Sequence, residues 1–253
     1  MDYKYGWIPQ RPDARDVKFT VEAPQELQSV DLRDKYKVPA PYNQGQLGSC
    51  SGNSWAFLVH FDLLNKHDQV DVTPFQPSRL FIYYYERLIE NTVNSDSGAM
   101  LRDGIKAIAT YGVPGEDLWP YDIDKFTQVP SPEAVAAATQ FKAVQYQSVD
   151  NSNKQLLVNA LLQGFPIAFG LSLYESFESD DVMQTGYVPM PSPSERMIGG
   201  HAIAIVGYVK EEDMFIIRNS WGVDWGMNGY CKIPADYICS DQASDFWILT
   251  LIQ

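Results

Sequence analysis

The sequence predicts an α+β fold, in which helices and strands occupy different parts of the chain. Its 253 residues and 45% hydrophobic content suit one large domain or two small ones with a substantial core. Helical patterns fill most of the first half, and short β-like apolar runs fill most of the second half. Because the two kinds of element are separated along the chain, we do not expect a doubly wound parallel sheet.

Each predicted helix combines an apolar pattern with a residue that starts or stops a helix. The longest one is apolar on nearly every side, so we expect it to be buried. The predicted helices are one from Ser54 to Leu64, one over 78–90 with Ser78 as N-cap, one over 99–111 ended by Gly112, a short Ala-rich one opened by Ser131 and Pro132, and one over 153–163 ended by Gly164.

The predicted strands are short runs rich in β-branched and aromatic residues. They are Ile167–Leu173, Ala202–Val209, Met214–Arg218, Tyr230–Ile233 and Phe246–Leu251. Residues 1–29 are polar and interrupted by prolines, which predicts an extended N-terminal arm or a small appendage. We therefore divide the chain into this extension, a mainly helical half over 30–140 and a mainly β half over 141–253.

The charge balance disfavours two classes of partner. Lys and Arg number 19 against 32 Asp and Glu, which gives a formal net charge of −13. Nucleic acids and anionic lipid surfaces both need a basic face, so we expect neither as a partner. The apolar runs are too short to span a membrane, and residues 1–7 have no apolar stretch typical of a signal peptide.

The three cysteines are too few for a disulfide scaffold and lack the paired spacing of a zinc site. One of them, Cys50, lies where a Gly- and Ser-rich stretch runs into a long helix. A thiol at a helix N-terminus has a lowered pKa, and its thiolate is nucleophilic. Whether Cys231 and Cys239 are bridged or free stays open.

A thiolate nucleophile needs a base and a group that orients this base. His201 is the best candidate base, because it begins an apolar run and follows two glycines that leave room for a substrate backbone. Asn219 ends a later run and can orient an imidazole. For His60 and His67, we expect structural or surface roles.

Three blocks of residues resemble the papain-like cysteine peptidases of the C1 type. They are Gln-Gly-x-x-Gly-Ser-Cys at 44–50, Gly-His-Ala-x-Ala-x-Val-Gly-Tyr at 200–208, and Arg-Asn-Ser-Trp-Gly-x-x-Trp-Gly-x-x-Gly-Tyr at 218–230. The blocks occur in the family's order, and the resemblance extends from Val30 to about Trp247. It implies that Cys50 is the nucleophile, His201 the base, Asn219 the orienting residue and Gln44 the side-chain donor of the oxyanion hole. Trp221 then shields the Asn–His hydrogen bond from water.

The resemblance also implies an architecture and an activity. The expected papain-like fold has a helical half and an antiparallel β-barrel-like half, with the active-site cleft between them. The expected activity is that of a cysteine endopeptidase with a resting pair of Cys50 thiolate and His201 imidazolium. It acts on a peptide or protein substrate without a metal or organic cofactor. We expect a monomer, and the resemblance favours a secreted or extracytoplasmic location.

Three departures from the family pattern make the chain resemble bacterial members. The Trp that usually follows the nucleophile is replaced by Ser51, and a disulfide-forming Cys before it is replaced by Leu47. The Cys-Asn-Gly-Gly stretch that lines the family's cleft is replaced by residues 94–99. The chain therefore lacks the usual disulfide beside the site.

The resemblance also suggests which residues bind the substrate. We expect Gly98 and Ala99 to pair with the peptide backbone, and a pocket for the side chain two residues before the cut. The residues expected around this pocket and the reacting groups are Met100, Leu101, Gly170, Gly200, Ala202, Trp221 and Ser244. Apolar walls favour an apolar side chain in the pocket, whereas Asp245 on its floor would favour Arg or Lys.

Two other functions were weighed against this one. Gly48-Ser49-Cys50-Ser51-Gly52 fits the nucleophile elbow of α/β-hydrolases, but that elbow follows an apolar strand and the preceding residues contain two prolines. The other alternative is an occluded or silent papain-like protein that acts as a peptide-binding module. It would need a lost or covered catalytic residue, and the sequence retains all four.

Overall fold

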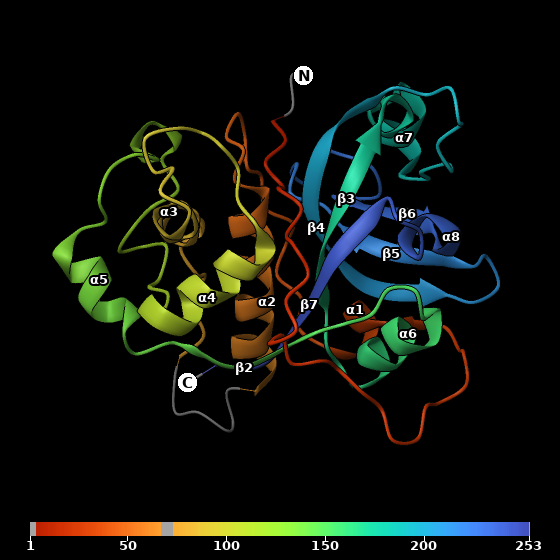
Figure 1. Cartoon of the computed structure of the whole chain (residues 1–253), viewed down its shortest axis with the longest axis horizontal. Helices are drawn as coiled ribbons and strands as arrows, with labels where there is room; N and C mark the ends of the chain where they lie inside the picture. Colours follow the sequence, from red (N-terminus) through yellow and green to blue (C-terminus); the bar gives the residue numbers. More distant parts are fainter. Residues whose placement is uncertain (1–3, 67–72, 253) are drawn as a thin grey trace.

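Helix α2 (Cys50–Lys66) lies at the centre of the molecule, between a group of helices and a sheet (Figure 1). The structure is a computed structural model that describes residues 4–66 and 73–252, so His67 lies outside the described residues. α3 (Arg79–Ile89) and α4 (Leu101–Tyr111) pack on one side of α2, and strands of the sheet pack on the other. This central position makes α2 the element that both halves hold in place.

Helices α3 and α5 (Pro132–Ala138) begin directly after their predicted caps, whereas α2 begins at Cys50, four residues before the predicted Ser54, and α4 begins at Leu101 and not at 99. The Ser78 hydroxyl accepts a hydrogen bond from Phe81 N at the start of α3, and Ser131 caps α5 in the same way. Gly112 has a φ of 81° and ends α4. The remaining helices are α1 (Leu32–Lys35), α6 (Lys154–Leu162), α7 (Asp180–Thr185) and α8 (Ala235–Ile238), with short 3-10 turns at Ile123–Lys125 and Glu175–Glu178.

A seven-stranded antiparallel sheet forms the second half within the described residues, in the order β2-β7-β3-β4-β5-β6 with β1 on β4. The predicted α+β class is thus confirmed, but the expected barrel-like half is an open sheet whose end strands are β2 and β6. The strands are β1 (Val30–Asp31), β2 (Ala143–Ser148), β3 (Ile167–Tyr174), β4 (Met197–Val209), β5 (Met214–Arg218), β6 (Tyr230–Pro234) and β7 (Ala243–Ile252).

The sheet contains more strand than the apolar runs predicted. β4 begins at Met197 and not at Ala202, and its first residues are half-exposed or exposed. The edge strand β2 was not predicted, since most of its side chains are exposed or half-buried. The apolar residues of these segments are too few to mark a strand, and backbone pairing with a neighbouring strand defines them instead.

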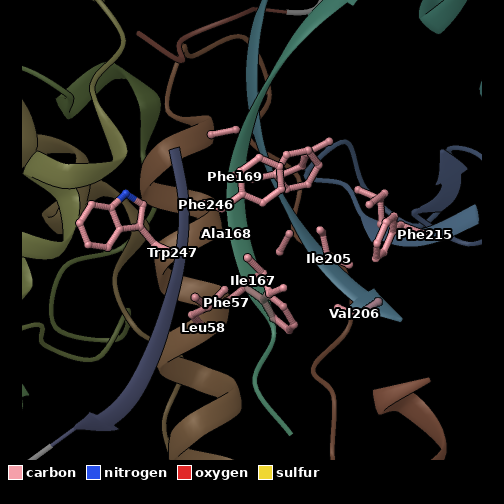
Figure 2. Close-up of a cluster of buried hydrophobic side chains, with 14 of the residues drawn as sticks. Phe57, Leu58, Ile167, Ala168, Phe169, Ile205, Val206, Phe215, Phe246 and Trp247 are labelled. Atoms are coloured by element: carbon pink, nitrogen blue, oxygen red, sulfur yellow. The ribbon is translucent and has the colours of Figure 1, made fainter. Parts of the chain in front are cut away.

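Large apolar side chains fill the space between α2 and the sheet (Figure 2). Phe57 of α2, Phe169 of β3 and Phe246 of β7 are buried here, and the last two rings stack at 5.0 Å. Burial of such a side chain contributes about 1.5–3 kcal/mol. The packing fixes α2 against the sheet, so its first residue, Cys50, lies beside β4.

The N-terminal arm (residues 4–29) is extended and passes between the helices and the sheet (Figure 1). It is bound along its length. Asp16 forms a largely buried ion pair with Arg102 of α4, and Phe19 N donates to Ser148 O at 2.8 Å. The arm therefore continues across the boundary between the two halves.

Candidate active site

Cys50 is the first residue of α2 and is completely buried. The start of α2 favours a thiolate, because its unpaired N–H groups carry partial positive charge. Burial acts in the opposite direction and raises the pKa of the Cys50 thiol to about 12, although backbone hydrogen bonds of Ala202 and Gly6 lower it in part. These two contacts put the thiol between β4 and the N-terminal arm.

His201 and Asn219 are brought together by two neighbouring strands. His201 lies in β4 and Asn219 directly follows β5, and these strands pair with Ala204 opposite Arg218. His201 Nε2 lies 2.8 Å from Asn219 Oδ1. Because this amide oxygen accepts, Nε2 carries the proton, and Nδ1 is left as the basic nitrogen. Nδ1 is buried without a hydrogen-bond partner among the described residues.

The environment of His201 favours the neutral imidazole. Burial lowers the pKa of His201 to about 4, against a smaller raising effect of the Asn219 hydrogen bond. The Trp221 ring stacks on His201 with a centroid distance of 5.1 Å and an interplanar angle of 27°. In this covered state the pKa directions of Cys50 and His201 favour a neutral thiol and a neutral imidazole, not the expected ion pair.

Gln44 reaches the site with its side-chain amide. Nε2 donates to Leu47 O at 3.0 Å and to Lys4 O at 3.1 Å, so the amide already holds one carbonyl oxygen of the arm. Its other end is held by Ser220, whose hydroxyl donates to Gln44 Oε1 at 2.6 Å. The amide orientation is thus set, with Nε2 bound to the arm and to Leu47.

Residues 6–8 of the arm bind by backbone hydrogen bonds to both sides of the site. Ala99 N donates to Gly6 O at 2.7 Å, and Ile8 N donates to Ala99 O at 3.2 Å. On the opposite side, Trp7 N donates to Gly200 O at 3.0 Å. Trp7 and Ala99 form a parallel bridge. The arm therefore lies across Cys50 and His201 as an extended peptide.

Two aromatic side chains of the arm fill the space beside these groups. The Trp7 indole lies against Gly170 and Gly200, where an added Cβ would come within 1.9 Å and 2.8 Å of its ring atoms. Tyr5 packs on His201 and on Trp221, with ring centroids 6.4 Å and 6.5 Å apart. The glycines on β3 and β4 therefore make the room that the arm occupies.

The space beside Gly170 and Gly200 that the Trp7 indole fills is called the Trp7 pocket, and Asp245 forms its polar end. Its Oδ2 accepts from Trp7 Nε1 and from Gln10 N, both at 2.9 Å. Burial raises the pKa of Asp245 to about 6, and the two hydrogen bonds lower it in part. Its φ of 62° is a left-handed conformation, which an Asp residue tolerates better than most.

The structure brings most of the predicted substrate residues around the arm, but not all of them. Ser244 pairs opposite Gly170 in the sheet, beside the Trp7 pocket. Leu101, in contrast, is completely buried, and its carbonyl accepts from Trp55 Nε1. Leu101 therefore contributes to the core, while Met100 is half-buried and hydrogen-bonds through its N–H to Glu90.

Two contacts of the site were not anticipated from the sequence. One is the Ser220–Gln44 bond, for which the position next to Asn219 was the available signal. The other joins Ser51, which follows the nucleophile, to the buried Glu86 at 2.6 Å. Burial raises the pKa of Glu86 to about 8, which favours its protonated form at neutral pH. No sequence signal links a residue of α3 to this position.

Three further features concern the cysteines, the helices and possible metal ligands. Cys231 and Cys239 are free, as is Cys50. In the part of the chain that the structure describes, no helix combines the length and apolar character needed to cross a membrane. The same residues contain no group of three or more His, Cys, Asp or Glu side chains that could hold a metal ion.

Fold and family model define the class of this protein. The model of the papain family cysteine proteases matches residues 27–245, so the chain belongs to this family of enzymes, which hydrolyse peptide bonds. The chain is 37% identical to xylellain, a cysteine protease from the bacterium Xylella fastidiosa. The two structures superpose with a TM-score of 0.86 over 98% of this chain and 96% of xylellain.

Other relatives cover a range of sequence identities. The "Uncharacterized peptidase C1-like protein L477" of Acanthamoeba polyphaga mimivirus is 40% identical over 97% of this chain and 86% of its own length. Mouse cathepsin K is 29% identical over 89% of this chain, which spans 65% of that protein. A cysteine protease of Carica candamarcensis shares the fold, with a TM-score of 0.62 and 23% identity over 88% of this chain and 97% of its own.

Proposed function

We propose that this chain is a cysteine endopeptidase in which Cys50, His201, Asn219 and Gln44 perform catalysis. One observation carries the proposal. The His201–Asn219 hydrogen bond of 2.8 Å leaves the buried Nδ1 as the base, on the strand that also contacts the Cys50 thiol through Ala202. This is the nucleophile, base and orienting group that thiol catalysis requires.

In the proposed mechanism the arm first leaves the site. Exposure to water removes the burial that keeps the thiol and imidazole neutral, so the proton moves from Cys50 to His201 Nδ1. The thiolate attacks the scissile carbonyl, and the imidazolium protonates the leaving amine. His201 then takes a proton from water, and the resulting hydroxide attacks the thioester and releases the acid, which restores the Cys50 thiolate and His201 imidazolium.

Gln44 and the backbone N–H of Cys50 stabilise the negative oxygen of the intermediate. Gln44 Nε2 already donates to a carbonyl oxygen, that of Lys4, which supports this role. The Ser220 hydroxyl holds the amide so that no rotation is needed during the reaction. One such donor is worth about 2.7–4 kcal/mol in the transition state.

The proposed substrate is an extended peptide that takes the place of the arm. Ala99 N and O and the Gly200 carbonyl, which now bind residues 6–8, would then bind its backbone. The arm makes a latent enzyme of the chain. Trp7 of the arm forms a parallel bridge with Ala99. Gln44 binds the carbonyl oxygen of Lys4 in the arm and not the oxygen of a carbonyl group under attack.

Substitution Cys50→Ala tests the proposal. We expect it to abolish peptide hydrolysis and to leave the circular dichroism spectrum and the melting temperature nearly unchanged, because one small side chain replaces another at the start of α2. Hydrolysis at the wild-type rate by Cys50→Ala would disprove the assignment. His201→Ala should be similarly inactive.

The arm also keeps a second function open, that of an occluded peptide-binding module without turnover. An epoxide that alkylates active-site thiols separates the two. A catalytic Cys50 reacts stoichiometrically once the arm is removed, whereas a silent site does not react even then.

A further inference from the structure

The loop that carries the nucleophile and the segment that binds the peptide backbone meet at one carboxylate. Both oxygens of Asp96 accept from Gly48 N, at 3.0 Å and 3.1 Å. Asp96 Oδ1 also accepts from the Tyr83 hydroxyl at 2.6 Å. The same hydroxyl accepts from Gly98 N at 3.1 Å. A continuous chain of hydrogen bonds thus runs from Gly48 to Gly98.

Each end of this chain adjoins a part of the site. Gly48 lies in the nucleophile loop (residues 44–49), next to Leu47, whose carbonyl binds Gln44 Nε2. Gly98 lies in the peptide-binding segment (residues 97–100), next to Ala99, whose N and O both bind the arm. Asp96 is therefore placed to affect the oxyanion donor and the backbone-binding groups together.

We propose that Asp96 is a positioning residue that fastens the nucleophile loop to the peptide-binding segment through Tyr83. This role rests on the proposed peptidase function. No covalent link does this work, because the three cysteines are Cys50, Cys231 and Cys239, and none of them is bridged. Hydrogen bonds to an ionised carboxylate are about twice as strong as those between neutral groups, which suits them to this task.

Asp96 is not needed to close its own loop. Other groups do so: Ser95 N donates to Thr92 O at 3.0 Å, and Arg87 Nη1 donates to the carbonyls of Val93 and Ser95. Asp96 lies at the surface, whereas Tyr83 is completely buried. The Arg87 guanidinium lies 4.0 Å from the Tyr83 ring centroid and holds the ring from one face. The rigid member of the link is therefore Tyr83, and Asp96 joins it to the loop.

Three full-length variants test the proposal. Asp96→Ala removes the link to Gly48 and to Tyr83, and Tyr83→Phe removes the link to Gly98 while Asp96 still binds Gly48. The matched control is Asp124→Ala, which removes one exposed carboxylate from the same half of the molecule. Each variant is measured by hydrogen exchange of backbone amides in the arm-bound full chain. After removal of the arm, kcat and KM for a peptide are measured and expressed per thiol titrated with an epoxide.

We expect Asp96→Ala to speed exchange about tenfold in both 44–49 and 97–100, and to lower kcat/KM about tenfold through both kcat and KM. Tyr83→Phe should speed exchange in 97–100 and raise KM with kcat nearly constant. Asp124→Ala should change neither quantity. A residue that merely supports folding would lower the number of titratable thiols without changing kcat or KM per thiol.

Two results would overturn the proposal. One is faster exchange in Asp96→Ala that is confined to residues 92–96, outside both segments. The other is an unchanged kcat and KM per titrated thiol. If the wild-type chain hydrolysed no peptide at all, the peptidase function itself would fail, and the exchange measurement would still decide whether Asp96 links the two segments.

Discussion

Asn219 forms a hydrogen bond of 2.8 Å with His201, and this bond decides what its loss should do. We expect Asn219→Ala to lower kcat/KM about 10–100-fold, because the residue orients the base but transfers no proton. His201→Ala should lower it by about 10²–10⁴-fold or more. Steady-state kinetics of the two variants, corrected for titratable thiol, check this order. An equal or larger loss in a fully folded Asn219→Ala would contradict the division of roles.

Asp245 gives the pocket a feature that the sequence alone could not assign. The apolar walls favoured an apolar side chain, but the Asp245 carboxylate accepts from the Trp7 indole inside the pocket. The side chain two residues before the cut is expected to enter this pocket. We therefore expect peptides with Arg at that position to be cleaved at least as fast as those with Leu, since an ionised partner offsets the cost of burying this carboxylate.

Asp245→Asn is the matched test of this preference. It keeps the size and the acceptor oxygen but removes the charge, so the ratio of Arg to Leu cleavage should fall about tenfold. The ratio is measured by competition between two peptides that differ only at that position. A ratio that Asp245→Asn leaves unchanged would show that the charge does not face the bound side chain.

The residues of the site differ in how far the sequence predicts them. Cys50, His201 and Asn219 belong to short motifs that resemble the papain-like peptidases, so the resemblance implies that they lie together, and the His201–Asn219 contact is present. Ser220 and Asp96 act through contacts with distant loops. Such pairings depend on how the halves dock, which local patterns do not encode.

At the scale of elements, capping residues predicted one end of each of three helices, since α3 and α5 begin and α4 ends as expected, whereas α2 begins four residues before the predicted Ser54. The start of β4, in contrast, carries two glycines where the Tyr5 and Trp7 rings approach the backbone, and it forms a strand by pairing with β3. A segment shaped for binding thus loses the apolar signal that makes a strand predictable.

The burial of the site elements also makes stability depend on pH. Burial lowers the pKa of His201 to about 4 from 6.5, so the folded, covered state binds this proton less tightly than the unfolded chain does. The contribution of neutral His201 to the free energy of unfolding is full above pH 6.5 and is lost as pH falls toward 4. Burial raises the pKa of Asp245 to about 6 from 3.8, so this group has the opposite effect and adds stability as pH falls from 6 toward 4.

We therefore expect Asp245→Asn to lose more stability than the wild type on acidification. The difference in the free energy of unfolding between pH 7 and pH 4.5 should grow by roughly 1–3 kcal/mol, since one pKa unit corresponds to about 1.4 kcal/mol. Urea unfolding of both full-length proteins at the two pH values measures it. Equal losses in the two proteins would mean that the Asp245 pKa is the same in the folded and unfolded chain.

At the scale of the whole molecule, the sequence predicted an extended arm but not its path. Its prolines and scattered aromatic residues carry no helical or strand pattern, and an arm packed on the outer surface would have the same sequence character. The path depends on complementary features far along the chain: the glycines at 170 and 200, the Asp245 carboxylate and Arg102. The two halves and the arm therefore define one site together.

Removal of the arm is the prediction that follows at this scale. A chain that starts at Glu26 loses the contacts of residues 4–8, the Asp16–Arg102 pair and the Phe19–Ser148 bond, but it keeps β1 and its pairing with β4. A tethered segment acts at an effective concentration of about 1 mM, so even an arm with an intrinsic Kd of about 10 μM covers the site about 99% of the time. We expect the shortened chain to hydrolyse peptides roughly 100-fold faster than the full chain, and a synthetic peptide of residues 4–20 to inhibit it.

Trp7→Ala in the full chain should give a smaller increase in the rate of hydrolysis, because it empties the pocket but leaves the backbone hydrogen bonds. Equal rates for the full and the shortened chain, both fully folded and with equal titratable thiol, would show that the arm does not control access to Cys50.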